Sequence, residues 1–457
     1  MPASPPLSLL ATARALAQGH TTSLTLVEQA LARISAPEGE GARTFTQVHT
    51  QAAQEQAAKI DAHRKAGHPL PLLAGIPMSV KDLFDEAGST TTAGSAVLAG
   101  SPPAQHDAIA VHNAKQAGLI SIGRTSMTEF AFSGVGINPH TGTPANPWQR
   151  DQRRIPGGSS SGAAISVTDG MAHIALGSDT GGSCRIPAAL TGLVGYKPTA
   201  SRISTVGTVP LSFTLDSLGS IGHTVACCWA TDQALTGTPP LWTDCPTPEQ
   251  TPAPRLGILQ NYATDGLDNT VSQTYQNALR TLEKAGASLH DVTLPELAEL
   301  PHINRLGGFP APESLTWHQQ LIATKAELYD PFVLKRILRG KEQTAVDYIT
   351  LIQARQRLIA QATQRLGTYD AIVMPTVPCV APKIADMSDD TLYTRTNLAL
   401  LRNPTITNFL DGCAISLPCH PHGTAPVGLM AMQFNNKDAH LFRIATWLEH
   451  ALAPSRG

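Results

Sequence analysis

Two glycine-serine segments constrain this chain more than any other feature of its sequence. Gly157-Gly-Ser-Ser-Ser-Gly162 opens into a helix-like stretch, and Gly177-Ser-Asp-Thr-Gly-Gly-Ser-Cys-Arg-Ile-Pro187 follows a short apolar strand and precedes another helix start. A Gly/Ser run alone is most often a flexible linker. Because both segments stand at ordered junctions between a strand and a helix, we instead expect them inside a packed α/β structure.

The second segment suits acyl transfer. A serine hydroxyl attacks a carbonyl only after a base takes its proton, and the resulting oxyanion needs preorganised N–H donors. The N–H groups of Thr180, Gly181, Gly182 and Ser183 can converge on one oxygen, and the helix expected from Arg185 favours negative charge at its start. We therefore predict an oxyanion hole formed by these four N–H groups, with Ser183 as the nucleophile.

The base is predicted upstream, at the end of a buried strand. Neither segment contains a histidine, but the apolar run Leu73-Ala-Gly-Ile-Pro-Met-Ser-Val-Lys-Asp82 carries Lys81 near its end. The reference pKa of a lysine is about 10.4, and burial lowers it. A lysine alone is usually a surface residue with a buried stem. The two serine segments make Lys81 a candidate base.

Other interpretations of these residues are weaker. Glycine loops before helices bind phosphate, but neither a P-loop ending nor Gly-x-Gly-x-x-Gly is present. Cys184 could act as a thiol nucleophile, although we expect it to point away from the oxyanion hole and to pack as a small hydrophobe. His420-Pro-His422 lacks further ligands at a suitable spacing. We expect no metal and no cofactor.

Together, Lys81, the Gly-Gly-Ser-Ser-Ser-Gly loop and the Gly-Ser-Asp-Thr-Gly-Gly-Ser-x-Arg-Ile-Pro-Ala run resemble the amidase signature family, serine hydrolases with a Ser-cisSer-Lys triad. Family-like segments cover nearly the whole chain. The resemblance implies that Ser183 is the nucleophile, that Ser159, 24 residues earlier, is the bridging cis-serine, and that Lys81 is the base. Ser161, where many members have glycine, and Cys184, where isoleucine is common, depart from the pattern without removing a catalytic group.

Four further residues are expected to support the triad. Asp179 and Arg185 flank the nucleophile and would pair with one another, which would fix the loop and balance charge beside the oxyanion hole. Gly158 would relieve crowding next to the cis peptide, and Ser160 belongs to the same support. We give these four residues structural roles.

The substrate depends on the pocket walls, which the triad does not determine. By the resemblance, the segment Phe130, Ala131, Phe132, Ser133 and Gly134 lines the acyl side, and the variable stretch 306–328 shapes the outer pocket. Few charged residues fall there. We therefore expect a stand-alone amidase for a small neutral, apolar or aryl amide, anilide or carbamate, such as an aryl acylamidase or urethanase. A glutaminase A subunit of a tRNA-dependent amidotransferase, working with partner subunits, and an inactive amidase-like binding protein remain alternatives.

Helix-like and strand-like segments alternate along the 457 residues. The resemblance and this alternation predict one large α/β/α layered domain over residues 1–457, with a mixed, mostly parallel central sheet flanked by helices. Its expected parts are N-terminal helices over about 1–65, a catalytic core over about 66–235, and a C-terminal part over about 254–457 that joins the same sheet. The clearest predicted helices and strands are Leu7 to Gln18, Leu24 to Ile34 with a capping box at Thr25-Leu-Val-Glu28, a helix through Ala117 capped by Asp107, Ala345 to Leu366, Leu119 to Gly123, Ala172 to Leu176 and Ala371 to Met374.

Composition excludes several classes of partner. A net charge of −2 with 15% charged residues leaves no basic stripe for nucleic acid. The seven cysteines have no framework spacing, which indicates free thiols in a reducing compartment. No apolar run is long enough to span a membrane. The stretch from Leu7 to Ala17 is interrupted by Arg14 and follows no basic residue, unlike a secretory signal. We expect a cytoplasmic protein without nucleic-acid or membrane partners, compatible with a homodimer.

Overall fold

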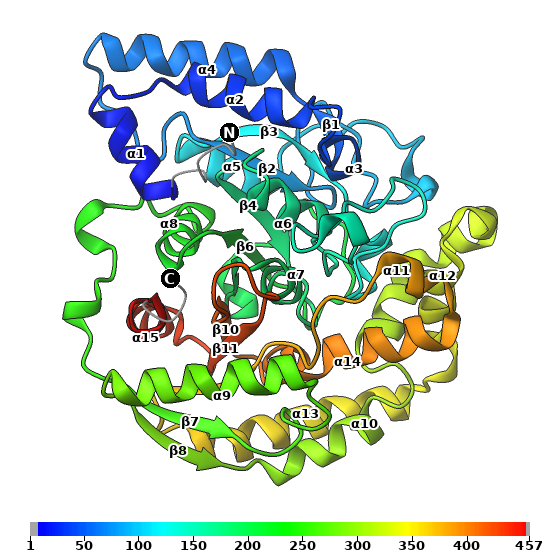
Figure 1. Ribbon diagram of the computed structural model, residues 1–457. Coiled ribbons are helices and arrows are strands. Elements are labelled where there is room, and N and C mark those ends of the chain that lie inside the picture. Colours follow the sequence, from blue (N-terminus) through cyan, green and yellow to red (C-terminus); the bar gives the residue numbers. More distant parts are fainter. Residues whose placement is uncertain (1–7, 454–457) are drawn as a thin grey trace.

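The strands of this chain form one sheet. The computed structural model describes residues 8–453, and within that range eleven strands follow the order β1-β3-β2-β4-β6-β5-β10-β11-β9-β7-β8 (Figure 1). The strands are β1 (Phe45–Val48), β2 (Pro77–Lys81), β3 (Ile120–Thr125), β4 (Ile174–Ser178), β5 (Val194–Lys197), β6 (Leu218–Gly222), β7 (Arg255–Leu259), β8 (Ser288–Val292), β9 (Ala371–Pro375), β10 (Cys413–Pro418) and β11 (Gly428–Gln433).

The mixed sheet is confirmed, but parallel neighbours are not the majority that we predicted. β2 runs parallel to β3 and β4, and β7 runs parallel to β8 and β9. The other six neighbouring pairs among the described strands are antiparallel. The reason is local, because β5 and β6, and likewise β10 and β11, are joined by loops without a crossover α-helix, so each pair turns back on itself.

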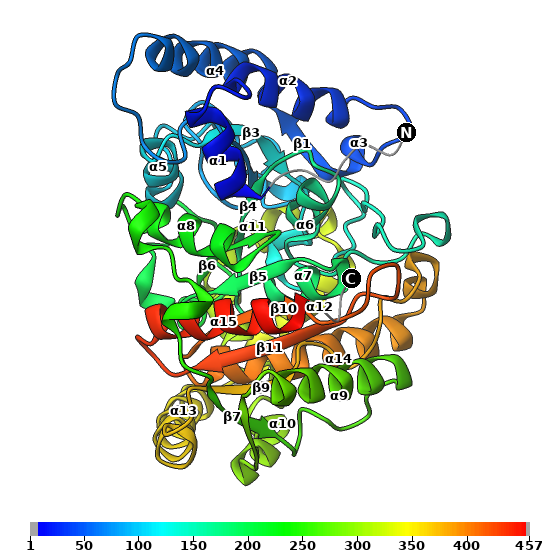
Figure 2. The ribbon, with the colours of Figure 1, turned by 60° about the vertical axis from the view of Figure 1, so that its left-hand side comes forward.

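Helices cover both faces of the sheet, as the α/β/α prediction requires. Along β9, Ala371 and Val373 pack into one hydrophobic cluster and Ile372 and Met374 into another, because successive side chains of a strand point to opposite faces. One face is covered by α1, α5, α8, α9 and α15, and α8 and α15 lie in front of the strands in Figure 2. The other face is covered by α2, α4, α6, α7, α13 and α14.

The α-helices match the sequence pattern more closely than the strand directions do. They are α1 (Leu9–Ala17), α2 (Ser23–Ile34), α3 (Gly41–Thr44), α4 (Thr50–Lys65), α5 (Ile109–Gln116), α6 (Ser161–Thr168), α7 (Arg185–Thr191), α8 (Val225–Leu235), α9 (Asn269–Lys284), α10 (Leu300–Ile303), α11 (Pro310–Lys325), α12 (Pro331–Leu338), α13 (Ala345–Leu366), α14 (Asp390–Phe409) and α15 (Asp438–Leu452). The bounds predicted for α13 are confirmed, and the predicted start of α1 at Leu7 lies outside the described residues.

Two predicted helix caps are wrong. α2 begins at Ser23, two residues before the predicted capping box, and the side chain of Thr22 caps it by accepting the Thr25 N–H. Asp107 does not cap α5, because its carboxylate instead accepts the Ala87 N–H at 2.8 Å and contacts Lys115. The Thr22 side chain takes the Thr25 N–H, and the Ala87 N–H and Lys115 take the Asp107 carboxylate. The sequence alone does not reveal these competing hydrogen bonds.

The proline-rich link after α8 contains only two short 3₁₀ helices, Trp242–Asp244 and Pro248–Gln250, before β7 begins. The segments on its two sides share the sheet, since β7, β8 and β9 continue it beyond β11. No helix within residues 8–453 is long and apolar enough to cross a membrane.

Candidate active site

Lys81 and Ser178 meet because their strands are parallel neighbours. Lys81 ends β2 and Ser178 ends β4, so both side chains stand at the carboxyl edge of the pair. The Lys81 ammonium nitrogen lies 2.7 Å from Ser178 Oγ and 2.7 Å from Ser159 Oγ. Lys81 is fully buried, with 0% of its surface exposed. The predicted contact between Lys81 and Ser159 is therefore present, and Ser178 is an additional partner.

The surroundings make a neutral Lys81 accessible near physiological pH. Burial lowers the pKa of Lys81 from 10.5 to about 8, because the charged ammonium loses its hydration. The nearby groups of Cys184, Asp179 and Asp216 act in the opposite direction and raise this pKa. Lys81 can therefore exchange a proton in a pH range where an exposed lysine stays charged.

The loop around Ser159 is held from several sides. The Gly158–Ser159 peptide bond is cis, as the resemblance implied. The Gly158 N–H donates to the Gly134 carbonyl at 2.8 Å, and a Cβ at Gly158 would lie 2.7 Å from the backbone of Gly136. The Ser160 N–H donates to the Ser183 carbonyl at 3.3 Å. Gly158 thus permits a close approach of two backbones, and Ser160 joins the two serine loops.

Ser183 lies at the end of its loop with 3% of its surface exposed. Within the described part of the chain, its hydroxyl makes no hydrogen bond, so the predicted contact between the hydroxyls of Ser159 and Ser183 is not formed in this structure. The backbone N–H groups of Thr180, Gly181 and Ser183 also have no protein partner there. The nucleophile candidate therefore stands beside three N–H groups that are available to an oxygen atom.

Gly182 does not belong to this set, which corrects the prediction of four donors. Its N–H donates to Asp179 Oδ1 at 2.8 Å. The other carboxylate oxygen of Asp179 accepts the Cys184 N–H at 3.1 Å. Asp179 therefore folds back over its own loop and takes up the N–H group that sequence reasoning had assigned to an oxyanion.

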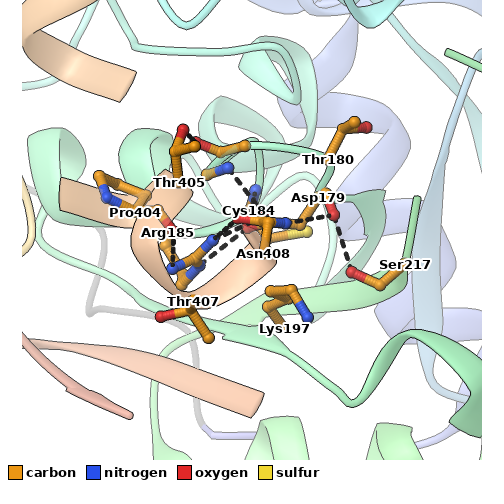
Figure 3. A network of polar contacts seen from close by, with 12 residues as sticks. Asp179, Thr180, Cys184, Arg185, Lys197, Ser217, Pro404, Thr405, Thr407 and Asn408 are labelled. Carbon is orange, nitrogen blue, oxygen red and sulfur yellow. Dashed lines mark hydrogen bonds and ion pairs between the residues drawn. The ribbon is translucent and has the colours of Figure 1, made fainter. Parts of the chain in front are cut away.

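Asp179 and Arg185 form the predicted ion pair. Arg185 Nη2 lies 2.8 Å from Asp179 Oδ1, and both side chains are fully buried. Asn408 of α14 donates to Asp179 Oδ1 at 3.0 Å and accepts from Arg185. Figure 3 shows this network at the start of α7. Burial alone would raise the pKa of Asp179, but the Arg185 guanidinium holds it well below its usual range.

We expect Arg185→Met to lower the free energy of unfolding by about 3–5 kcal/mol, because it leaves the buried Asp179 carboxylate without its cation. Urea unfolding followed by circular dichroism measures the change. Arg150→Met is the matched control, since Arg150 pairs with Asp169 at 2.6 Å in a partly exposed position. This pair should contribute about 1 kcal/mol or less. Equal stability of Arg185→Met and the parent would contradict the structural role of the pair.

The predicted pocket segment turns sharply. Phe130 and Ala131 have φ angles of 49° and 59°, in the left-handed region. The Phe130 ring is buried against His318 and Tyr329, with ring centroids 4.3 and 5.5 Å away, and against Trp317 at 6.0 Å. Phe130 thus points into an aromatic cluster, whereas Ala131 lines a small cavity together with Ser178 and Thr180.

The other three residues of this segment make mainly structural contacts. Phe132 packs partly buried against the core, and its carbonyl accepts from Arg336 at 2.9 Å. The Ser133 hydroxyl and the Gly134 N–H both donate to Asn397 Oδ1, at 3.0 and 2.8 Å. Ser133 and Gly134 are therefore held against α14, and the assignment of the five-residue segment to the acyl side stays a prediction.

A small cavity of about 10 Å³, room for about one water molecule and partly open to solvent, adjoins Ser178 and Thr180. Its polar lining also includes Thr208 and Asp216. Its apolar lining consists of Leu83, Ala131, Val209, Leu211 and Leu218. Sequence reasoning missed Asp216 and Asn408, because both come from distant segments without a motif, whereas Ser178 stood unrecognised inside the Gly-Ser-Asp-Thr-Gly-Gly-Ser run.

Cys184 has the predicted inert surroundings. It is fully buried, and burial together with the Asp179 charge raises the pKa of its thiol to about 12. Its sulfur lies close to the backbones of Gly177 and Gly219, where a Cβ would meet it at 2.9 and 3.3 Å. A thiolate at this position is therefore disfavoured.

Within residues 8–453, no group of three or more His, Cys, Asp or Glu side chains is arranged to hold a metal ion.

The fold, with a buried lysine in contact with one of two glycine-serine loops, agrees with the family that the motifs resemble. The chain belongs to the amidase signature family, since the sequence profile of the family Amidase matches residues 25–442, which confirms the resemblance drawn from the motifs.

Individual relatives extend over most of the chain. It is 35% identical over 402 residues to 2-amino-5-chloromuconic acid deaminase of Comamonas testosteroni, covering 87% of this chain and 86% of that protein. It is 31% identical over 486 residues to the A subunit of glutamyl-tRNA(Gln) amidotransferase from Salinispora arenicola (strain CNS-205), covering 98% of each. A solved chain from a vestigial protein complex, described as revealing the origins of an s-triazine catabolic enzyme, superimposes with a TM-score of 0.87 at 28% identity, covering 97% of this chain and 98% of that one.

Proposed function

We propose that this protein is a stand-alone serine amidohydrolase that cleaves the C–N bond of a small amide through an acyl-enzyme on Ser183. One observation carries the proposal: the fully buried Lys81 contacts Ser159 at 2.7 Å, in the loop that adjoins Ser183 and its unpaired N–H groups. A buried amine next to a serine is the arrangement that a lysine base requires.

The residues act in sequence. Neutral Lys81 takes a proton from Ser159, and Ser159 takes one from Ser183 as the latter attacks the carbonyl carbon. A serine can bridge because its hydroxyl both donates and accepts. The oxyanion is stabilised by the N–H groups of Thr180, Gly181 and Ser183, and the proton returns to the leaving nitrogen. Water then hydrolyses the acyl-enzyme. The contact between Ser159 and Ser183 is expected to close when substrate binds, as catalytic hydrogen bonds often do.

The pocket favours a neutral acyl group. Five of the nine residues around the cavity are apolar, and the neighbouring Phe130 lies in an aromatic cluster. An apolar wall gives little discrimination between an amide, an anilide and a carbamate, but it disfavours an unpaired charge. We therefore propose neutral aryl or apolar amides, anilides and carbamates as the substrate class. An acidic substrate, like the muconic acid in the name of the Comamonas relative, is the contrasting case.

A glutaminase A subunit is the second candidate. The relative from Salinispora arenicola, at 31% identity over 98% of both chains, favours it. This candidate predicts turnover of glutamine that depends on partner subunits and no turnover of anilides by the chain alone. An inactive binding protein is the third, and it predicts that Ser183 does not react.

The pH dependence of catalysis follows from Lys81. Because the base must be neutral and its pKa is about 8, kcat/KM should rise about tenfold per pH unit up to about pH 8 and then level off. The nearby Cys184, Asp179 and Asp216 groups all raise this pKa, so none of them would move the rise to lower pH. Initial rates between about pH 5.5 and 10 measure the profile. A rate that is flat from about pH 6 to 9 would exclude Lys81 as the titrating base.

Covalent labelling tests the proposed function directly. The purified chain is treated with a fluorophosphonate and examined by intact mass and peptide mapping, beside a panel of p-nitroacetanilide, benzamide, an aryl carbamate, a muconate-type acid and glutamine. One adduct on Ser183 with turnover of the neutral compounds supports the proposal. Turnover of the acid alone would overturn the substrate class, and the absence of both adduct and turnover would favour a partner-dependent or inactive protein.

A further inference from the structure

The loop predicted to form the oxyanion hole lies between two carboxylates, of which only Asp179 has an ion pair within residues 8–453. On one side, Asp179 is neutralised by Arg185. On the other side, Asp216 Oδ1 accepts the Thr180 hydroxyl at 2.6 Å. The second oxygen, Oδ2, accepts the N–H groups of Leu211 and Ser212 at 2.9 and 3.1 Å. Asp216 therefore connects the loop that precedes β6 to the first residue of the oxyanion hole.

The main chain is held on both sides of Thr180, at Asp179 and at the Gly181 carbonyl, which accepts the Thr405 hydroxyl at 3.3 Å. The Asp179 N–H donates to the Ser217 carbonyl at 2.7 Å, and the Ser217 hydroxyl and N–H both donate to the Asp179 carbonyl. After this point, the N–H groups of Thr180 and Gly181 have no partner in the described structure. Among residues 8–453, the Thr180 hydroxyl is then the only hydrogen-bonded group of Thr180 itself, and its acceptor is Asp216.

The loop that carries Asp216 is itself held from α11. Glu313 of α11 is buried and accepts the Ser212 hydroxyl, together with the hydroxyl and the N–H of Thr214. These bonds fix the loop on both sides of the exposed Phe213. Asp216 is thus the end of a continuous chain of contacts that runs from α11 to Thr180.

At the pH at which Lys81 is neutral, Asp216 is an acceptor. Burial raises the pKa of Asp216 to about 6, an effect limited by its bonds to Thr180, Ser212 and Leu211 and increased by the nearby Glu313. Above about pH 7 the carboxylate is ionised, so it accepts the Thr180 hydroxyl. The Thr180 hydroxyl is thus bound by a negative charge, while the Thr180 N–H has no partner among the residues that the structure describes.

We propose that Asp216 is a positioning residue for the reaction: through the Thr180 hydroxyl it sets the direction of the Thr180 and Gly181 N–H groups toward the oxyanion. The proposal rests on the proposed function, because it assumes that Ser183 is the nucleophile. Through this hydrogen bond Asp216 acts on the transition state, because an oxyanion donor matters only where negative charge develops. Loss of Asp216 should therefore lower kcat and leave KM nearly unchanged.

The test uses the rate at which a fluorophosphonate labels Ser183, because this reaction forms an oxyanion without requiring the natural substrate. Ser183 should be labelled about 10- to 100-fold more slowly in Asp216→Asn and in Thr180→Val than in the parent. This decrease in rate should not exceed the decrease that removal of a complete oxyanion donor causes. Thr180→Ser restores the hydroxyl and should label within about threefold of the parent. The double variant should be labelled no more slowly than the slower single variant, because both substitutions remove the same hydrogen bond.

Asp438→Asn is the matched control. Asp438 is a buried carboxylate that, like Asp216, accepts three hydrogen bonds, in its case from the Tyr196 hydroxyl, the Thr199 hydroxyl and the Thr199 N–H. Ser183 of the Asp438→Asn variant should be labelled at the parental rate. If Asp216→Asn does not fold, the comparison of Thr180→Val with Thr180→Ser still decides the matter.

The outcomes separate the two proposals. If the parent is not labelled on Ser183, the proposed function fails. If the parent is labelled and Thr180→Val reacts at the parental rate, the positioning role of Asp216 is overturned while the hydrolase remains. With p-nitroacetanilide or another compound that the parent turns over, a rise in KM with unchanged kcat in Asp216→Asn would likewise overturn the positioning role, since it would indicate contact with the substrate.

Discussion

Ser183→Ala should lower kcat by about 10⁴- to 10⁶-fold, the loss expected when the nucleophile of a serine hydrolase is removed. The remaining N–H groups cannot compensate, because without the hydroxyl no acyl-enzyme forms. Folding should be intact, since the Ser183 hydroxyl makes no hydrogen bond in the described structure. Steady-state rates on the best substrate of the panel, with thermal unfolding of the same preparation, measure both parts of the prediction.

Ser161→Ala is the control for this experiment. It makes the same substitution at another buried serine, which lies at the start of α6 in the other glycine-serine segment. The proposed relay does not use Ser161, so kcat should stay within about threefold of the parent. Measurable turnover by Ser183→Ala above about 1% of the parental rate, with fluorophosphonate still bound elsewhere, would assign the nucleophile to another residue.

The sequence predicts Ser183 and Lys81 as candidate catalytic residues from local patterns, and the family resemblance adds Ser159 as the predicted bridge. Lys81 ends an apolar run, and Ser159 and Ser183 stand in glycine-rich turns before helices. Their meeting depends on the parallel register of β2 and β4, which places Lys81 beside Ser178. Such a register is set by pairing between distant segments, so the sequence predicts the chemical groups and not their contacts.

The oxyanion hole shows where local reasoning ends. The pattern around Gly182 suggests a free N–H, yet the N–H is bound by Asp179. The position of that carboxylate is fixed by Arg185 and by Asn408, which lies 229 residues away along the chain. Asp179 precedes Gly182 by only three residues, but nothing near either residue in the sequence signals Asn408. The same holds for Asp216, which is 36 residues from Thr180.

Within the fold, too, the sequence predicts local features better than contacts between distant segments. The periodicity of apolar residues predicted α13 to the residue, because a helix is determined by contacts three and four residues apart. The predicted majority of parallel strands failed, because direction depends on whether a connection crosses the sheet or turns back. The loop from β10 to β11 turns back, and those strands pair antiparallel from Cys413↔Gln433 to Pro418↔Gly428.

The second large effect concerns the base: Lys81→Met should lower kcat by about 10³-fold or more, because Ser159 then has no group to accept its proton. Methionine has a similar length and suits a fully buried position. Lys197→Met is the matched control. Lys197 is also buried with a pKa lowered to about 8, but it donates to the Pro198 and Gly412 carbonyls and contacts neither serine. Its loss should leave kcat within about tenfold of the parent.

The pH dependence of the free energy of unfolding tests the pKa of Lys81 without measuring turnover. The pKa of Lys81 is about 8 in the folded chain and 10.5 for an ordinary lysine. Between these values the unfolded chain binds the proton and the folded chain does not, so stability rises with pH through this window. The free energy of unfolding of the parent, minus that of Lys81→Met, should increase by on the order of 3 kcal/mol from pH 8 to 10.5. A constant difference would contradict a lowered pKa.

Lys81→Arg separates the charge of the residue from its role as a base. A guanidinium keeps the positive charge and can still donate to Ser159 and Ser178, but it does not give up a proton below about pH 12. If Lys81 acts only by its charge or its hydrogen bonds, Lys81→Arg should retain a substantial part of the activity. If Lys81 is the base, Lys81→Arg should be as inactive as Lys81→Met at every pH from about 6 to 10, whereas the parent becomes more active as the pH rises to about 8.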